Sequence, residues 1–192
     1  MLALLCASLL LTAVIVRITY TPVSNLDQTA KILENNLQKK ESYIYSFIND
    51  KRSFNDLKEL QRHPQAAIGL IKQFTTDRNI WFVTFTNNEL NFWSGIKVIP
   101  DYPATIKEGP NFRKESNGMY EAIRKSEGNF SVIFFIPVKF DYRFQNEYLR
   151  NTFATDLLKD DNIEIADFTD KPVYDVHSSV SDHKYLFSVK LK

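Results

Sequence analysis

The most regular feature of the sequence is a series of apolar residues spaced by three or four positions between Val23 and Asp50. The series contains Leu26, Ala30, Leu33, Leu37, Ile44 and Phe47, with Lys40 filling the gap in it. Such spacing places apolar side chains on one face of a helix, so residues 23–50 are predicted to form one long helix. At 1.5 Å per residue this helix spans roughly 42 Å. The length suits a stalk that leaves a membrane or a helix that covers a core, and one helix can do both.

Residues 1–16 are apolar or small throughout, and Arg17 follows them. A transmembrane helix needs roughly 17–25 such residues. The long side chain of Arg17 can reach the interface and extend the span to Tyr20. Residues 1–20 are therefore predicted to be a transmembrane anchor. A cleaved signal peptide is the alternative, but no basic residue precedes the apolar run. The missing basic flank also indicates that residues upstream of Met1 have been lost.

Two short helices and two strand pairs are predicted after the long helix. Ser53 and Asp56 are spaced as a capping box that opens one helix, and Pro64 starts the next. Residues 79–100 read as two strands joined at Asn87-Asn88, a pair that tolerates the positive φ of a tight hairpin. A second strand pair, 118–126 and 129–139, turns at Glu127-Gly128. Residues 132–136 are apolar on both faces, which is typical of a central strand.

A short helical patch is predicted over residues 146–158, followed by strands over 162–168, 172–176 and 185–191. Helices that precede a run of antiparallel hairpins predict an α+β fold, in which the long N-terminal helix and the short helices pack on a central antiparallel sheet. Residues 21–192 are predicted to form one domain, since no linker divides them. Whether its strands form one lobe or two stays open, because residues 82–94 and 163–178 are similar strand–turn–strand segments.

Charge and motifs exclude most chemical functions. The 24 Lys and Arg residues balance 23 Asp and Glu residues, so the basic surplus of a nucleic-acid-binding protein is missing. His177 and His183 lie in a Ser-rich polar segment whose spacing fixes no metal geometry. Ser94 lacks the glycine frame of a nucleophile elbow, and no phosphate-binding glycine motif occurs. We therefore predict no catalytic residue, no metal and no cofactor.

The sequence is richer in aromatic residues with nearby hydrogen-bond donors than in catalytic motifs, and these residues indicate a small-ligand site. Aromatic walls with a few donors suit a small molecule, especially one with a carboxylate or another anion that Arg can bind. An alternative is that the aromatic rings fill the core while Arg and Tyr line its wet edge. The predicted ligand contacts are Trp93, Tyr120, Arg124, Tyr142 and Arg143.

The order of these elements resembles the extracytoplasmic sensor region of bacterial membrane-bound histidine kinases. The likeness covers most of residues 20–191, and its closest local matches are FFIPVKFDYRFQNEYL (residues 134–149) and the hairpin at Pro172-Val173-Tyr174. Such regions often adopt Cache folds, relatives of PAS domains, with a central antiparallel sheet and a long N-terminal helix. The resemblance implies a periplasmic domain that is held at the inner membrane and whose ligand shifts the long helix and, through it, a cytoplasmic kinase.

The sequence also departs from a complete receptor of this kind. It holds no second membrane helix and no phosphoacceptor or ATP-binding motif, so a kinase core would lie outside these residues. The Arg followed by Trp-Tyr of amino-acid-binding Cache domains is absent, which leaves the ligand unidentified. We expect a ligand-sensing domain that forms a homodimer through the helix at residues 26–47. The alternative is a membrane-anchored module that binds a periplasmic protein; a small secreted hydrolase is disfavoured.

Overall fold

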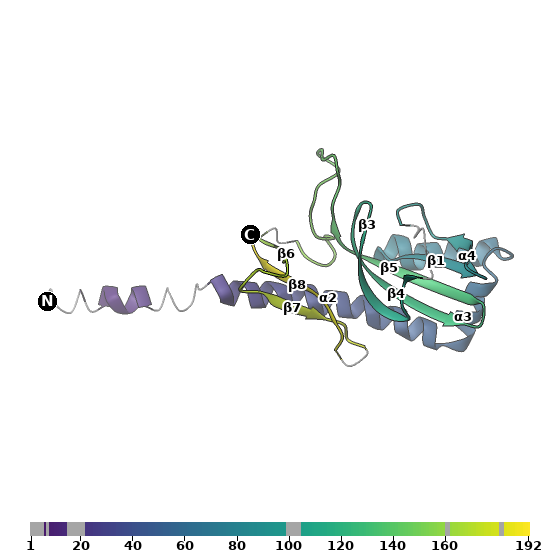
Figure 1. Cartoon of the computed structure of the whole chain (residues 1–192), viewed down its shortest axis with the longest axis horizontal. Helices are drawn as coiled ribbons and strands as arrows, with labels where there is room; N and C mark the ends of the chain where they lie inside the picture. The colour runs from purple at the N-terminus through teal and green to yellow at the C-terminus, as the bar shows by residue number, and fades with distance from the viewer. Residues whose placement is uncertain (1–5, 7, 15–21, 99–104, 160–161, 181–182) are drawn as a thin grey trace.

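The computed structural model describes residues 6, 8–14, 22–98, 105–159, 162–180 and 183–192. Their α+β layout confirms the predicted fold class. The helices are α2 (Pro22–Asn49), α3 (Lys51–Lys58), α4 (Pro64–Ile71) and the π-helical η1 (Lys72–Thr76). The strands are β1 (Trp81–Thr86), β2 (Glu89–Trp93), β3 (Gly109–Glu115), β4 (Gly118–Glu127), β5 (Phe130–Phe140), β6 (Ile163–Ile165), β7 (Tyr174–His177) and β8 (Tyr185–Leu191). Figure 1 shows two sheets placed one after the other along α2.

Helix α2 buries one stripe of side chains against both sheets. The buried positions are Leu26, Ala30, Leu33, Leu37, Glu41, Ile44 and Ile48. The prediction that Lys40 continues the stripe is therefore wrong, because a step of four from Leu37 keeps Glu41 on the buried face. A glutamate thus occupies a core position in the middle of this helix.

The opposite face of α2 is polar and exposed. Because the apolar stripe is buried within the chain, a contact between the α2 helices of two copies would have to use this other face. Ile32, with 48% of its surface exposed, is the large apolar residue there. A homodimer through the long helix stays a prediction.

The short helices follow α2 with little connecting chain. Asp50, and not the predicted Ser53, caps α3, because its carboxylate accepts a hydrogen bond from the backbone N–H of Ser53 at 2.8 Å. Pro64 starts α4 as predicted, since its missing N–H costs nothing in a first turn. Phe74 of η1 is fully buried against the main sheet.

The main sheet is antiparallel with the strand order β2-β1-β5-β4-β3. The two predicted hairpins that build most of it are confirmed. Asn87 and Asn88 take φ values of +54° and +64° in the β1–β2 turn, and Gly128 takes +60° in the β4–β5 turn. β5 is the central strand, as predicted for residues 132–136. Its even-numbered residues in that run face α2, and Ile133 and Phe135 face a second core on the other side.

The small sheet has the order β6-β8-β7 and confirms the three strands predicted near the end of the sequence. Its core is continuous with the α2 side of the main sheet. The rings of Phe112 on β3 and Phe187 on β8 stack at 4.4 Å where the two sheets meet. Tyr174 donates a hydrogen bond to Glu34 of α2 at 2.8 Å, and Gln38 donates to the carbonyl of His177 at 2.9 Å. The sequence left open whether the strands form one lobe or two. The structure has two separate sheets, and both pack on α2.

Two local predictions are wrong. Strand β3 was not predicted, although it pairs with β4 over its whole length. Residues 146–158 contain no helix. The Asn146 side chain instead accepts hydrogen bonds from the N–H groups of Tyr148 and Leu149, which favours a turn. Phe153 then pairs with Lys139 as an isolated bridge beside β5.

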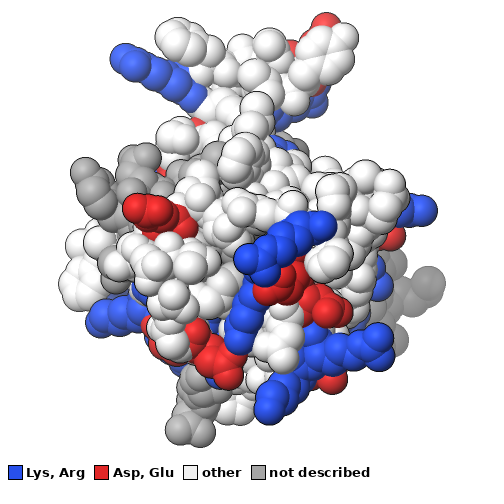
Figure 2. Space-filling model, turned by 90° about the vertical axis from the view of Figure 1, so that its right-hand side faces the viewer, with Lys and Arg blue, Asp and Glu red and all other residues white. Residues whose placement is uncertain are grey.

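The predicted anchor at residues 1–20 lies largely outside the described residues, which include only 6 and 8–14 of it. Among the residues that the structure describes, no helix has both the length and the apolar character needed to cross a bilayer. Figure 2 views the end of the body that lies farthest from the N-terminus, where acidic and basic side chains are interspersed. This face offers no continuous basic patch of the kind that binds phosphates.

Candidate functional site

The structure brings two of the five predicted ligand contacts together. Tyr120 is fully buried on β4, and Tyr142 follows the end of β5. Burial raises the pKa of the Tyr120 phenol, and the nearby Tyr142 phenol adds to the effect. The Tyr120 hydroxyl donates a hydrogen bond to Asn117 at 2.9 Å, so this side chain is held in place inside the core.

The other three predicted contacts lie on the edge strand β2, farther along β4 and next to Tyr142 after β5. Trp93 ends the edge strand β2 with 46% of its surface exposed. Arg124 lies four residues after Tyr120 on β4, and its guanidinium donates to the carbonyl of Ile106 at 2.9 Å and to Ser126 at 3.1 Å. Arg143 is exposed in the segment after β5, 5.9 Å from the ring of Phe144. Whether the five residues contact one ligand stays a prediction.

We expect Arg143→Ala to leave the fold intact. Its side chain is exposed, and such substitutions usually change stability by no more than about 0.5 kcal/mol. Thermal unfolding of the variant beside the unmodified chain measures this. A weaker ligand response in the same variant, with an unchanged melting temperature, would place Arg143 at a ligand site; an unchanged response to a confirmed ligand would remove it.

A hollow runs along α2. We call it the Asp156 groove, because Asp156 lines both of its adjoining parts, of about 480 Å³ and about 380 Å³. Its lining comes from α2, from the end of η1 and from the segment after β5. The lining residues are Ile32, Asn36, Lys39, Lys40, Tyr43, Asp77, Arg78, Thr155, Asp156, Leu157, Leu158 and Lys159.

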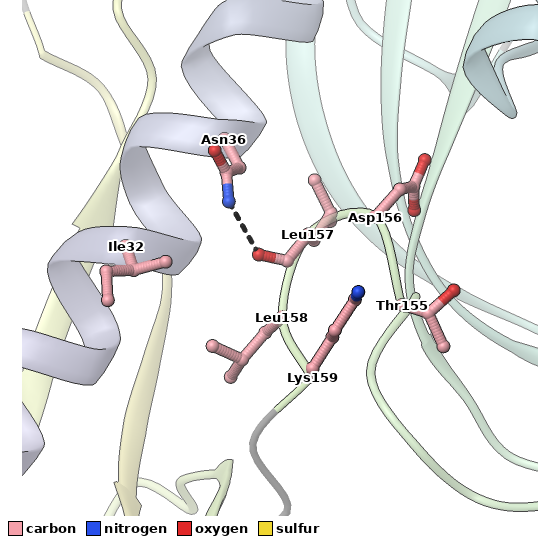
Figure 3. Close-up of a pocket in the computed structure, with 7 residues that line it drawn as sticks. All are labelled: Ile32, Asn36, Thr155, Asp156, Leu157, Leu158 and Lys159. Atoms are coloured by element: carbon pink, nitrogen blue, oxygen red, sulfur yellow. Dashed lines mark hydrogen bonds between the residues drawn. The ribbon is translucent and has the colours of Figure 1, made fainter.

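The outer wall of the groove is a turn that α2 holds in place. Leu157 and Leu158 both donate backbone hydrogen bonds to the carbonyl of Ala154, which closes the turn. Asn36 of α2 donates to the carbonyl of Leu157 at 2.9 Å, the bond drawn in Figure 3. Figure 3 also shows Leu158 pointing toward the helix and Lys159 extending back along the turn. The groove thus combines an apolar floor with a charged rim.

Four cations and two carboxylates line the Asp156 groove, which gives it a net charge of +2. Lys40 pairs with Asp156 at 2.5 Å and also donates to the carbonyl of Arg78 at 2.8 Å. The Arg78 guanidinium lies 4.0 Å from the ring centroid of Tyr43, in cation–π contact. Arg78 also donates to the carbonyl of Gln73 at 2.9 Å, and none of these contacts of Arg78 is with a carboxylate.

Two lysines around Asp156 are short of counter-charge. Burial lowers the pKa of Lys40, and the hydrogen bond and charge of Asp156 only partly oppose this. Burial also lowers the pKa of Lys97, and the negative charge of Asp156 again partly opposes this lowering. Asp156 is therefore the carboxylate that stabilises the charge of two buried ammonium groups. A bound anion would stabilise these charges further.

An aromatic wall adjoins the groove at Lys97. The Lys97 ammonium lies 4.7 Å from the ring centroid of Phe140 and 5.3 Å from that of Trp81. The Trp81 ring packs against the backbone of Gly95, where an added Cβ would lie 2.4 Å from a ring atom. The Ser94 hydroxyl has a structural role, because it accepts a hydrogen bond from the N–H of Phe82 at 2.8 Å.

Asp156, Lys40 and Lys97 were not predicted as site residues from the sequence. Lys97 offered one signal, as a single lysine in the apolar stretch Ile96–Pro100. Lys40 and Asp156 offered none, because they are separated by 116 positions in the chain. No group of three or more His, Cys, Asp or Glu residues suited to a metal ion occurs in the described part of the chain. Comparison of the chain with protein-family models, curated proteins and solved structures finds no match.

Proposed function

We propose that this chain is the ligand-sensing extracytoplasmic domain of a bacterial two-component sensor histidine kinase, and that its signal is an amphipathic anion bound in the Asp156 groove. The observation that carries the proposal is that α2 forms one wall of the groove and also packs on both sheets. A ligand in the groove would therefore contact α2, the helix that packs on both sheets of the domain.

The chemistry of the groove selects the ligand class. Its apolar floor, with Ile32, Leu157 and Leu158, suits a hydrocarbon or aromatic body. Its excess of cations suits a carboxylate or phosphate at one end of that body. Binding would shift the position of α2 only if the ligand interacts differently with two arrangements of the helix and the turn at residues 155–159.

The course of the chain agrees with a domain that reports to a membrane. The first half of α2 packs on the small sheet, which contains the last strand β8. Figure 1 shows the last strand beside this first half of the helix, so the start of α2 and β8 lie at the same end of the body. The central antiparallel sheet and long N-terminal helix also match the Cache-like, PAS-related layout that the sequence resembles. We place the domain outside the cytoplasm, at the inner membrane.

A ligand screen tests the proposal. We expect octanoate, benzoate or phenyl phosphate to raise the melting temperature of the full chain, by about 5–10 °C at a hundredfold excess over Kd. Lys159→Glu removes one cation from the rim and adds an anion, so it should abolish the shift. Differential scanning fluorimetry, with the chain in a mild detergent, measures both.

Lys107→Glu is the matched control, because Lys107 is exposed on the segment before β3, outside the groove. It should leave the shift unchanged. If none of the three probes stabilises the chain, or if both Glu variants lose the shift equally, the Asp156 groove is not the ligand site.

A second candidate function is a membrane-anchored module that binds a periplasmic protein. Phe144 and Tyr148 favour it, because they are 80% and 84% exposed in the segment that Figure 1 shows projecting above β3 and β5. The gene sequence beyond Lys192 separates the two functions. A second apolar span followed by kinase motifs supports the sensor, and a stop codon supports the module.

A further inference from the structure

Two glutamates meet between α2 and the main sheet. Glu41 lies in the buried stripe of α2, and Glu121 lies on the α2 side of β4, between Phe112 of β3 and Ile136 of β5. Both side chains are fully buried, and their carboxyl groups lie within hydrogen-bonding reach of each other. Two ionised carboxylates in such a place would repel each other without water to screen them.

The hydrogen-bond partners show what the pair lacks. Both oxygens of Glu121 and one oxygen of Glu41 are buried without a donor among the described residues. The other oxygen of Glu41 accepts hydrogen bonds from the N–H and the hydroxyl of Ser179, at 2.6 and 2.7 Å. An ionised carboxylate only accepts hydrogen bonds, so the contact between the two glutamates needs a proton on one of them. Ser179 suits the ionised form of Glu41, which leaves Glu121 to carry the proton.

Every element around the pair contributes a charged or titratable group. From α2, Tyr45 places a buried hydroxyl without a partner beside the two carboxyl groups, and its phenol is influenced by both. Glu108, just before β3, also acts on Tyr45. From the segment before β8, the charge of Lys184 acts on Glu121, while its ammonium donates to the carbonyl of Pro110 at 2.5 Å. Lys184 is the single cation among these groups, and it is shared with a carbonyl.

We propose that Glu41 and Glu121 share one proton that holds α2 to both sheets, so that loss of the proton releases this turn of the helix. The contacts are few and specific: the Glu121 carboxyl group faces Glu41 from the main sheet, and Ser179 donates to Glu41 from the segment after β7. Ionisation of both carboxyl groups breaks the first contact by repulsion and pulls on the second. This latch does not depend on the Asp156 groove or on any ligand.

The direction of the pH dependence follows from the geometry. Burial raises the pKa of Glu121 well above its ordinary value, and the neighbouring Glu41 raises it further. A carboxyl group whose pKa is higher in the folded chain than in the unfolded chain stabilises the fold at low pH. That stabilisation is complete below about pH 4.3, the ordinary pKa of glutamate, and is lost as pH rises toward the pKa of the folded chain.

Glu121→Gln tests the latch, because an amide fills the same space and keeps a donor without titrating. Between pH 5 and the pKa of the pair, the melting temperature of the full chain in a mild detergent should fall by about 3–5 °C for each pH unit. The variant should lose this slope. Glu41→Gln should keep a slope that ends at a lower pH, because burial still raises the pKa of Glu121 while the contribution of Glu41 is removed. Glu89→Gln, on the exposed edge strand β2, should keep it.

Hydrogen exchange separates a latch from a merely buried acid. Peptides that cover residues 37–45 and 178–180 should exchange several-fold faster in the unmodified chain than in Glu121→Gln at pH 8, and equally fast at pH 5. Equal slopes in the unmodified chain and Glu121→Gln would overturn the proposal. A rise in melting temperature with Mg²⁺ or Ca²⁺ at pH 8 that Glu121→Gln abolishes would also overturn it, because a cation would then lie between the carboxylates.

Discussion

Phe134→Ala should destabilise the chain by about 3–5 kcal/mol, the usual cost of removing a buried aromatic ring. Phe134 lies on the central strand β5 and is fully buried. Its ring centroid is 5.1 Å from that of Phe74 and 5.7 Å from that of Phe82. The substitution leaves a cavity where η1 and the main sheet meet. A fall in melting temperature of about 6–20 °C is expected for a chain of this size.

Phe168→Ala is the control for this result. The Phe168 side chain is fully exposed between β6 and β7, so the same change in side chain should alter stability by no more than about 0.5 kcal/mol. Urea unfolding followed by circular dichroism measures both variants. A loss below 1 kcal/mol for Phe134→Ala would mean that η1 does not pack on β5 as described.

Leu33→Ala should cost about 2–5 kcal/mol. Leu33 is fully buried in the stripe of α2, within the core that the small sheet shares. Alanine is a good helix former, so the loss cannot come from the helix itself and has to come from packing. The expected fall in melting temperature is about 4–20 °C.

The neighbouring Ile32 supplies the control on the same helix. Ile32→Ala removes a side chain that is 48% exposed, and alanine favours helix more than isoleucine does. Its effect on the free energy of unfolding should therefore be small. If Ile32→Ala proves the more damaging of the two in urea unfolding, α2 is rotated relative to the stripe described above.

The elements that local chemistry determines were predictable from the sequence. Asn87-Asn88 and Gly128 accept the positive φ of their turns, and Pro64 fits a first helical turn, so these boundaries were correct. β3 was missed because its sequence GPNFRKE has little alternation and gains its place by pairing with β4. Residues 146–158 were predicted as a short helix, whereas the Asn146 side chain accepts hydrogen bonds from the N–H groups of Tyr148 and Leu149 in a turn and the Asn151 side chain accepts one from the N–H of Tyr142.

The sites depend on contacts between distant parts of the chain, which explains why the sequence did not predict them. The burial of Glu41 was not predicted, because only the packing of the main sheet against α2 places Glu121 opposite it. Asp156 meets Lys40 only because the segment after β5 returns to the helix. Tyr120 and Tyr142 lie near each other, because both are close to the end of the β4–β5 pair. Whether they contact a ligand stays a prediction.

The order in which the chain is synthesised has a consequence for the first half of α2. Leu26, Leu33 and Leu37 are made early, but the core they enter also contains Val176 and Val189 of the last strands. At about 5–20 residues per second, roughly 7–28 s pass between synthesis of Leu37 and of Val176. During this time the apolar stripe has no permanent cover. A nascent chain of this protein therefore needs a chaperone, a membrane surface or a second copy to cover the stripe until its final sheet is complete.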